Sequence, residues 1–167
     1  IVWNDYLFIG TCYSEDYRSF KTARTNEYAI EILKEYFPKK RIIDLDLKKN
    51  DKIPYEGVLH LDCTFNPIGK DKCIIYKNGF VDESDYELIV DIFGEENCFN
   101  ITDEEMFEMN PNIFSISPEV VVSDKTFIRM NNHLRDVWGF TVEEIPYREV
   151  SKMGGLLRCS TMPLVRE

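Results

Sequence analysis

The sequence lacks long apolar runs, and basic residues are scarce in it. No apolar run reaches the roughly 18 residues that a membrane-spanning helix needs. Lys and Arg number 20 against 30 Asp and Glu, which gives a formal net charge of −10, and a chain this acidic repels the phosphates of nucleic acids. The opening stretch, IVWNDYLFIG, has no basic segment of the kind that begins a secretory signal. We therefore expect neither nucleic acid nor a membrane as a partner.

The cysteines lack the spacing of a zinc site or of a disulfide framework. There are five of them, at positions 12, 63, 73, 98 and 159. An odd number without a paired pattern favours free thiols. Free thiols are typical of a reducing compartment, so the sequence predicts a cytoplasmic protein.

Composition and local pattern indicate an α/β fold with a repeated unit. An apolar fraction of 44% and an aromatic fraction of 13% are typical of a globular chain, and the length suits one domain with a real core. The order strand, strand, helix, strand occurs over 57–101 and 112–145, and less cleanly over 1–47. The expected strands cover residues 1–10 (in two pieces), 41–47, 58–65, 71–80, 97–101, 112–117, 119–124 and 140–146, and the expected main helices cover 25–37, 82–94 and 125–138.

Several helix ends are visible in the sequence. Thr25 or Asn26 can cap the first helix, and Pro38 stops it. Thr102 with Glu105 three residues later forms a capping-box pattern, which predicts a further short helix from that point.

The stretch GVLHLDCTFNPIG, residues 57–69, places a histidine and a carboxylate two positions apart. Apolar and polar residues alternate there, which predicts a half-buried strand. On a strand, residues two apart point to the same side, so His60 and Asp62 would share a face. By itself such a pair is as consistent with a solvated surface as with a catalytic site.

Cys159 stands close after a pair of glycines in GGLLRCSTMP. Gly154 and Gly155 allow a tight turn or a close backbone approach. The neighbouring Arg158 would favour the thiolate, which is the nucleophilic form. The alternative is a small buried apolar residue, and this is our interpretation of the other cysteines in apolar strand patterns, at positions 63, 73 and 98.

Taken together, LHLDCTFNPIG and GGLLRCSTMP resemble the guanidine-modifying enzymes of the pentein fold. This group includes arginine deiminases, dimethylarginine dimethylaminohydrolases and amidinotransferases. A third similarity lies in LFIG followed, after a longer loop, by ARTN at a helix start. The resemblance implies an α/β-propeller of five ββαβ units, of which about three are present. Residues 1–167 would then be the C-terminal part of a single pentein catalytic domain.

The resemblance implies a role for each of four residues. Cys159 would be the nucleophile that attacks the guanidinium carbon, and His60 would protonate the leaving amine and later activate water. Asp62 would accept hydrogen bonds from the guanidinium, and Arg24 would pair with a substrate carboxylate. A further catalytic acid of the family would fall before Ile1, so the sequence departs from the pattern there. Arg158 also replaces a histidine that several members have before the nucleophile.

The function that this resemblance implies is covalent hydrolysis of a small guanidino substrate resembling arginine, with no metal and no organic cofactor. The alternative is amidino transfer to an acceptor amine, because both reactions use the same residues. A non-catalytic module on the same scaffold would predict loss of the nucleophile or the base, and both are present. Since three units of a propeller leave an open edge, we also expect a missing N-terminal segment of the same protein, and a homodimer is possible.

Overall fold

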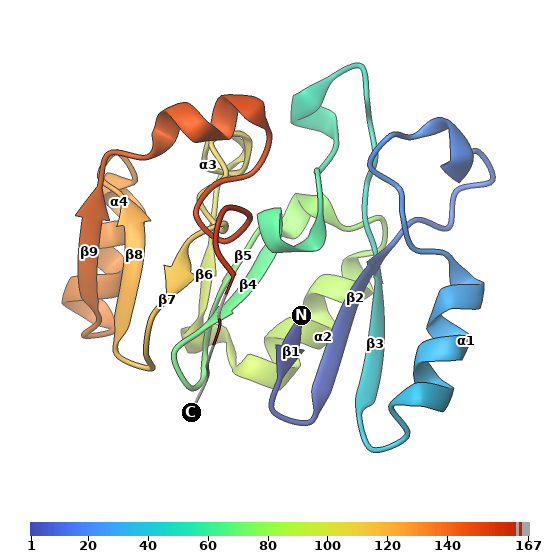
Figure 1. The fold of residues 1–167 in the computed structure, drawn as a ribbon. Helices are drawn as coiled ribbons and strands as arrows, with labels where there is room; N and C mark the ends of the chain where they lie inside the picture. Colours follow the sequence, from blue (N-terminus) through green and yellow to red (C-terminus); the bar gives the residue numbers. More distant parts are fainter. Residues whose placement is uncertain (163, 165–167) are drawn as a thin grey trace.

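The computed structural model describes residues 1–162 and 164, and they form three small sheets of three strands each (Figure 1). In each sheet the first two strands are antiparallel, and the third strand pairs in parallel with the second. The strands are β1 Val2–Trp3, β2 Tyr6–Thr11, β3 Arg41–Asp46, β4 Phe65–Ile68, β5 Lys72–Ile75, β6 Cys98–Asn100, β7 Phe114–Ser115, β8 Val120–Asp124 and β9 Thr141–Ile145. The predicted α/β fold of repeated ββαβ units is confirmed, including the first unit.

One helix crosses between the second and third strand of each unit, as a parallel connection requires. These helices are α1 Glu27–Tyr36, α2 Glu83–Phe93 and α4 Ile128–Asn132, and α3 Asp103–Phe107 lies between the second and third units. Short 3₁₀ helices complete the chain at Tyr17–Ser19, Pro54–Glu56, Leu61–Cys63, Lys77–Gly79, Glu95–Asn97 and Arg148–Met153. Among the described residues, no helix combines the length and the apolar character that a membrane crossing would require.

Local sequence signals explain most of the element ends. Asn4, with a φ of 49°, makes the turn that separates β1 from β2. The side chain of Asn26 accepts a hydrogen bond from the backbone of Ala29 and caps α1. Thr102 and Glu105 form the predicted capping box of α3. These contacts involve residues close in sequence, which is why the sequence predicts them.

The helix predicted over 125–138 has a different form. It begins three residues later, and after Asn132 it widens into a π-helical turn over His133–Val137. The backbone N–H of Trp138 reaches the carbonyl of His133, five residues back. The wider turn brings the His133 ring to 4.7 Å from Phe99 and 4.6 Å from Trp138, measured between centroids.

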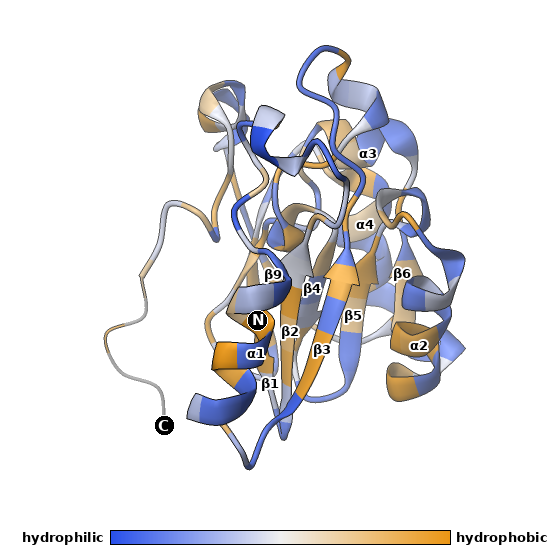
Figure 2. Ribbon diagram, turned by 90° about the vertical axis from the view of Figure 1, so that its right-hand side faces the viewer, coloured by the Kyte–Doolittle hydropathy of each residue, from blue (hydrophilic) through white to orange (hydrophobic). Residues whose placement is uncertain are grey.

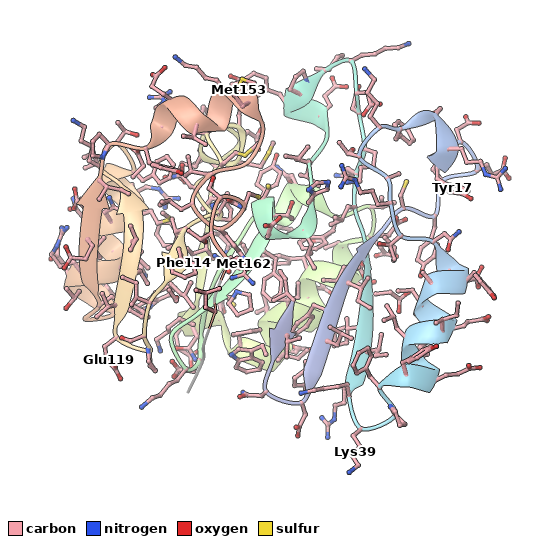
Figure 3. All side chains as sticks on the ribbon, viewed as in Figure 1. Tyr17, Lys39, Phe114, Glu119, Met153 and Met162 are labelled. Carbon is pink, nitrogen blue, oxygen red and sulfur yellow. The ribbon has the colours of Figure 1, made fainter. Side chains whose placement is uncertain are left out.

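A single core runs through all three units. Phe8 from β2 meets Phe65 from β4 edge-on at 5.0 Å, and Phe65 meets Phe93 from α2 at 5.7 Å. Met130 and Leu134 from the third unit belong to the same buried cluster. Figure 2 shows hydrophobic residues along β2 and β3, and Figure 3 shows side chains filling the space between the sheets.

A backbone bridge and a side-chain contact join consecutive units at fixed positions. Leu47 and Phe80 form an isolated bridge between the first and second units. Asn66, buried in the second unit, donates from its amide to the carbonyls of Pro111 and Ile113 at 2.7 and 3.1 Å. With the units joined in this way, the loops after β2, β3 and β9 lie at the same end of the molecule (Figure 1).

The strand predicted over 58–65 is wrong for most of its length. The chain is irregular up to His60, turns through the 3₁₀ helix Leu61–Cys63, and enters β4 only at Phe65. A 3₁₀ helix has three residues per turn, so side chains two apart point in different directions. His60 and Asp62 therefore do not share a strand face.

Candidate active site

A turn near the C-terminus carries Cys159, which is exposed. In Figure 1 this segment passes in front of β4 of the second unit. Gly154 and Gly155 both adopt positive φ, at 84° and 96°, a conformation that side-chain-bearing residues avoid. A Cβ atom on Gly155 would lie 2.7 Å from the Cβ of Cys159 and 3.0 Å from its sulfur. Both glycines thus suit the turn through their positive φ, and Gly155 also leaves the space that the thiol occupies.

Asn112, which is fully buried, holds this turn in place. Its Oδ1 accepts hydrogen bonds from the backbone N–H groups of Leu156, at 2.8 Å, and Cys159, at 3.1 Å. Its carbonyl accepts from the N–H of Arg158 at 3.1 Å. One buried side chain just before β7 therefore fixes the loop that carries the thiol.

The amide nitrogen of Asn112 contacts both the thiol of Cys159 and the carboxylate of Asp62. Its Nδ2 lies 3.2 Å from the sulfur of Cys159 and 3.1 Å from Oδ2 of Asp62. The thiol of Cys159 in turn lies 3.4 Å from the same carboxylate oxygen. Two of the predicted site residues, Cys159 and Asp62, are therefore in direct contact.

Cys63 completes this group. It is 1% exposed, as expected for a core cysteine, but its sulfur also belongs to the site. One atom each of Asp62, Cys63 and Cys159 lie within 4.8 Å of one another.

The environment makes Cys159 acidic for a thiol. A hydrogen bond from Cys63, helped by one from Asn112, lowers the pKa of Cys159 to about 7, against the opposing effects of burial and of Asp62. Hydrogen bonding to Cys159, burial and the Asp62 charge raise the pKa of Cys63 well above its usual range. Cys159 is therefore the member of the pair that ionises near neutral pH.

His60 and Arg24 line a different hollow, of about 270 Å³, together with Lys49. Burial, and then the positive charges of Arg24 and Lys49, lower the pKa of His60, while Asp62 opposes them. The Nε2 atom of His60 is buried and has no hydrogen-bond partner among the described residues. In the part of the chain that the structure describes, no hydrogen bond joins His60 to Cys159. The four predicted residues thus form two neighbouring pairs.

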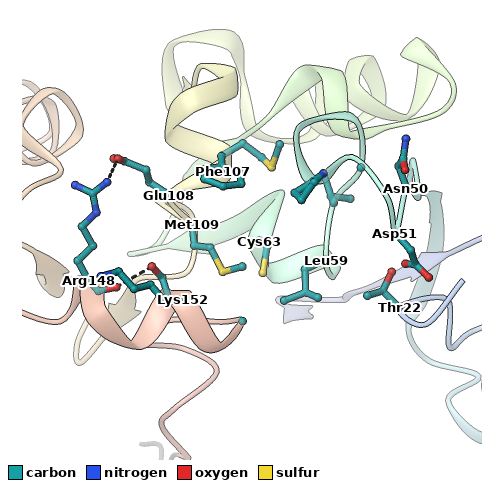
Figure 4. A pocket seen from close by; sticks show the side chains of 16 residues that line it. Thr22, Asn50, Asp51, Leu59, Cys63, Phe107, Glu108, Met109, Arg148 and Lys152 are labelled. Carbon is teal, nitrogen blue, oxygen red and sulfur yellow. Dashed lines mark hydrogen bonds and ion pairs between the residues drawn. The ribbon is translucent and has the colours of Figure 1, made fainter.

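A larger cavity of about 540 Å³ reaches Cys63 from the surface (Figure 4). Its walls come from the loop around Asn50, from α3 and the residues after it, and from the 3₁₀ helix Arg148–Met153, which are far apart in the sequence. Leu59 and Met109 lie beside Cys63, while Arg148 and Glu108 form an ion pair at the side. A cavity with an apolar floor and charged sides suits a small polar molecule with an aliphatic chain.

Sequence reasoning missed Asn112 and the contact between Cys63 and Cys159. Asn112 shows no local signal beyond a polar residue before a short apolar strand. Cys63 gives the signal of a core residue, which it is, and nothing in the sequence indicates the partner of its sulfur.

Comparison with known proteins identifies the class. Residues 79–166 match the family described as arginine deiminase. The uncharacterized protein YkgA of Bacillus subtilis (strain 168) is 30% identical over 167 residues, which are 99% of this chain and 50% of that protein.

Solved structures share the fold. The N-terminal domain of ArgZ, a cyanobacterial arginine dihydrolase bound to its product, has a TM-score of 0.75 at 17% identity, over 97% of this chain and 52% of that one. Another structure of this ArgZ domain holds a covalently bound reaction intermediate. SxtG, an amidinotransferase from Microseira wollei, has a TM-score of 0.70 at 18% identity, over 98% and 45%.

The fold and the family match define a pentein protein, built here of three ββαβ units. The chain belongs to the arginine deiminase family, and it is homologous to enzymes that modify guanidino groups. It spans about half the length of the relatives that it matches.

Proposed function

We propose that this chain is part of a cysteine-dependent guanidino hydrolase and contains its nucleophile. The observation that carries the proposal is the contact of the Cys159 sulfur with the Asp62 carboxylate, at 3.4 Å, beside the Asn112 amide. A carboxylate next to an isolated thiol is unfavourable for the thiolate, because like charges repel. A guanidinium bound by Asp62 removes that penalty and places its carbon at the sulfur.

The reaction would proceed in two halves. The Cys159 thiolate attacks the guanidinium carbon, and protonated His60 gives its proton to the leaving nitrogen. A water molecule then attacks the thiouronium carbon, neutral His60 takes the water proton, and the sulfur leaves as thiolate. Burial and the positive charges of Arg24 and Lys49 lower the pKa of His60, which favours the neutral imidazole that takes the water proton.

Arg24 would select the other end of the substrate. It lines the small hollow together with His60 and carries a planar guanidinium that can bind a carboxylate through two parallel bonds. An amino acid with a guanidino side chain presents such a carboxylate at its far end. This assignment favours an arginine-like substrate over a simple alkylguanidine.

The second candidate is amidino transfer, supported by the similarity to SxtG. Here an acceptor amine replaces water in the second half. A product assay on the full-length protein, with L-arginine and with or without an acceptor amine, separates the two. Release of ammonia or a ureido product without acceptor supports hydrolysis, and an acceptor-dependent guanidino product supports transfer.

Labelling tests the nucleophile directly. A haloacetamidine that mimics a guanidinium should modify Cys159, and Cys159→Ser should lose both the label and turnover. Cys98→Ser is the matched control, since Cys98 lies outside the site, and it should keep both. Labelling of Cys12 or Cys98 in place of Cys159 would contradict the assignment.

A further inference from the structure

The two sulfurs at the site differ sharply in their surroundings. Cys159 is exposed, whereas Cys63 is 1% exposed. The sulfurs are near neighbours, because both belong to the group whose atoms lie within 4.8 Å. The amide of Asn112 faces both, at 3.2 Å from Cys159 and 3.9 Å from Cys63.

We propose that Cys63 is a resolving thiol, which forms a reversible disulfide with Cys159 when a hydroperoxide oxidises the site. The disulfide itself needs no catalytic activity, and only its effect on turnover rests on the function proposed above. An accessible thiolate reacts first with an oxidant, and a second thiol in reach then captures the product.

Exposure and charge decide the order of the two steps. Cys159 ionises near pH 7, so a large share of it is thiolate in a neutral solution. Cys63 stays protonated, because its pKa is raised. The oxidant therefore meets Cys159 first, and Cys63 reacts only with the oxidised neighbour.

The chemistry balances with one equivalent of hydroperoxide. The Cys159 thiolate attacks the outer peroxide oxygen, the O–O bond breaks, and sulfenic acid and an alkoxide or hydroxide form. The Cys63 sulfur then attacks the sulfenic sulfur, the S–O bond breaks, and the oxygen leaves as water with the Cys63 proton. Both sulfurs are oxidised by one electron each, and the peroxide oxygens are reduced.

The local backbone allows the bond to form. Cys63 ends a one-turn 3₁₀ helix, and Cys159 lies in a turn after the glycine pair. Neither residue lies in a sheet ladder, so small shifts of either segment break no strand pairing.

A second cysteine pair in the same chain provides a comparison. The sulfurs of Cys73 and Cys98 are 3.5 Å apart, but the two residues are paired on adjacent parallel strands. Cys73 is 0% exposed, and burial raises its pKa above its usual range. The hydrogen bond from Cys73 lowers the pKa of Cys98, but Cys98 is only partly exposed. Both residues are also held in a parallel strand pairing, so this pair differs from Cys63 and Cys159 in access and in freedom to move.

The test uses the full-length protein treated with hydrogen peroxide and digested without reduction. We expect a linked pair of peptides containing Cys63 and Cys159, loss of alkylation at Cys159, and its return after a thiol reductant. Cys63→Ser and Cys63→Ala should instead accumulate sulfinic acid at Cys159 and fail to recover. Cys73→Ser is the matched control, since it also replaces a buried cysteine beside another sulfur, and it should behave as the wild type.

Some outcomes would overturn the proposal. Irreversible oxidation of wild-type Cys159 without a linked peptide would do so, as would linkage of Cys73 to Cys98 alone. Equal recovery of the wild type and the Cys63 variants would also exclude a resolving role. Since these readouts are chemical, a protein that forms the disulfide but hydrolyses no guanidine would reject only the proposed function.

Discussion

Replacing Asn112 by aspartate isolates the electrostatic role of one atom. Asn112→Asp keeps the oxygen that accepts the N–H groups of Leu156 and Cys159. It exchanges the donor Nδ2, which lies 3.2 Å from the Cys159 sulfur and 3.1 Å from Asp62, for an oxygen. The thiolate then loses a hydrogen bond and gains another negative neighbour.

The expected effect follows from the value of that hydrogen bond. A hydrogen bond to a charged group contributes about 1.5–3 kcal/mol, and about 1.4 kcal/mol corresponds to one pKa unit. The pKa of Cys159 should therefore rise from about 7 by about one to two units. At neutral pH the thiolate fraction, and with it the rate of alkylation, should fall by about five- to fifty-fold.

The assay is the rate of iodoacetamide modification of Cys159 against pH, followed by mass spectrometry. Well above the shifted midpoint, the variant should react as fast as the wild type, because the thiol itself is intact. A variant damaged in its fold would not recover in this way. Thermal unfolding of each variant checks the fold independently.

Asn110→Asp is the matched control. Asn110 is 1% exposed, lies two positions earlier, and is not among the hydrogen-bond partners of Cys159. It therefore introduces the same chemical change at similar burial without touching the thiol, and the midpoint should stay near that of the wild type. A folded Asn112→Asp protein with an unshifted midpoint would refute the role given to the amide.

Three further predictions follow from the same geometry. Asp62→Asn should reduce kcat/KM for a guanidino substrate at least tenfold, or about 1.4 kcal/mol, because the contact to the cation loses its charge; an unchanged kcat/KM would leave Asp62 as a surface residue. Arg24→Lys should raise KM for L-arginine more than for agmatine, which lacks the carboxylate, and equal effects on both would reject the clamp. Thr102→Ala should lower the free energy of unfolding, measured by urea titration, by about 0.5–2 kcal/mol, because it removes the cap of α3. Alkylation of Cys159 should not change, since this cap lies outside the thiol contacts. A stability equal to the wild type would show that the capping box contributes little.

The sequence determines the architecture because its signals are local. The turn at Asn4, the cap at Asn26 and the capping box at Thr102 each involve residues within a few positions. Apolar periodicity then assigns most segments to a strand or a helix, and the order of the elements repeats. The glycine pair before Cys159 is equally local, since Gly155 leaves the space in which that cysteine sits.

Tertiary structure alone decides how the site is assembled. The contact of Cys159 with Asp62 joins residues 97 positions apart, and that of Cys159 with Asn112 spans 47. Such pairs depend on how the units dock, and no local pattern encodes them. This is why the sequence could suggest Cys159 and Asp62, through resemblance, but not Asn112.

The segment around His60 shows where local pattern fails. Its alternation favours a strand, yet the chain must turn at Leu61–Cys63 to enter β4 and to bury Leu61 and Cys63. Packing against the neighbouring units outweighs the alternation. Thus the sequence suggests site residues through resemblance, whereas the turn determines that Asp62 faces the thiol and His60 lines the hollow with Arg24.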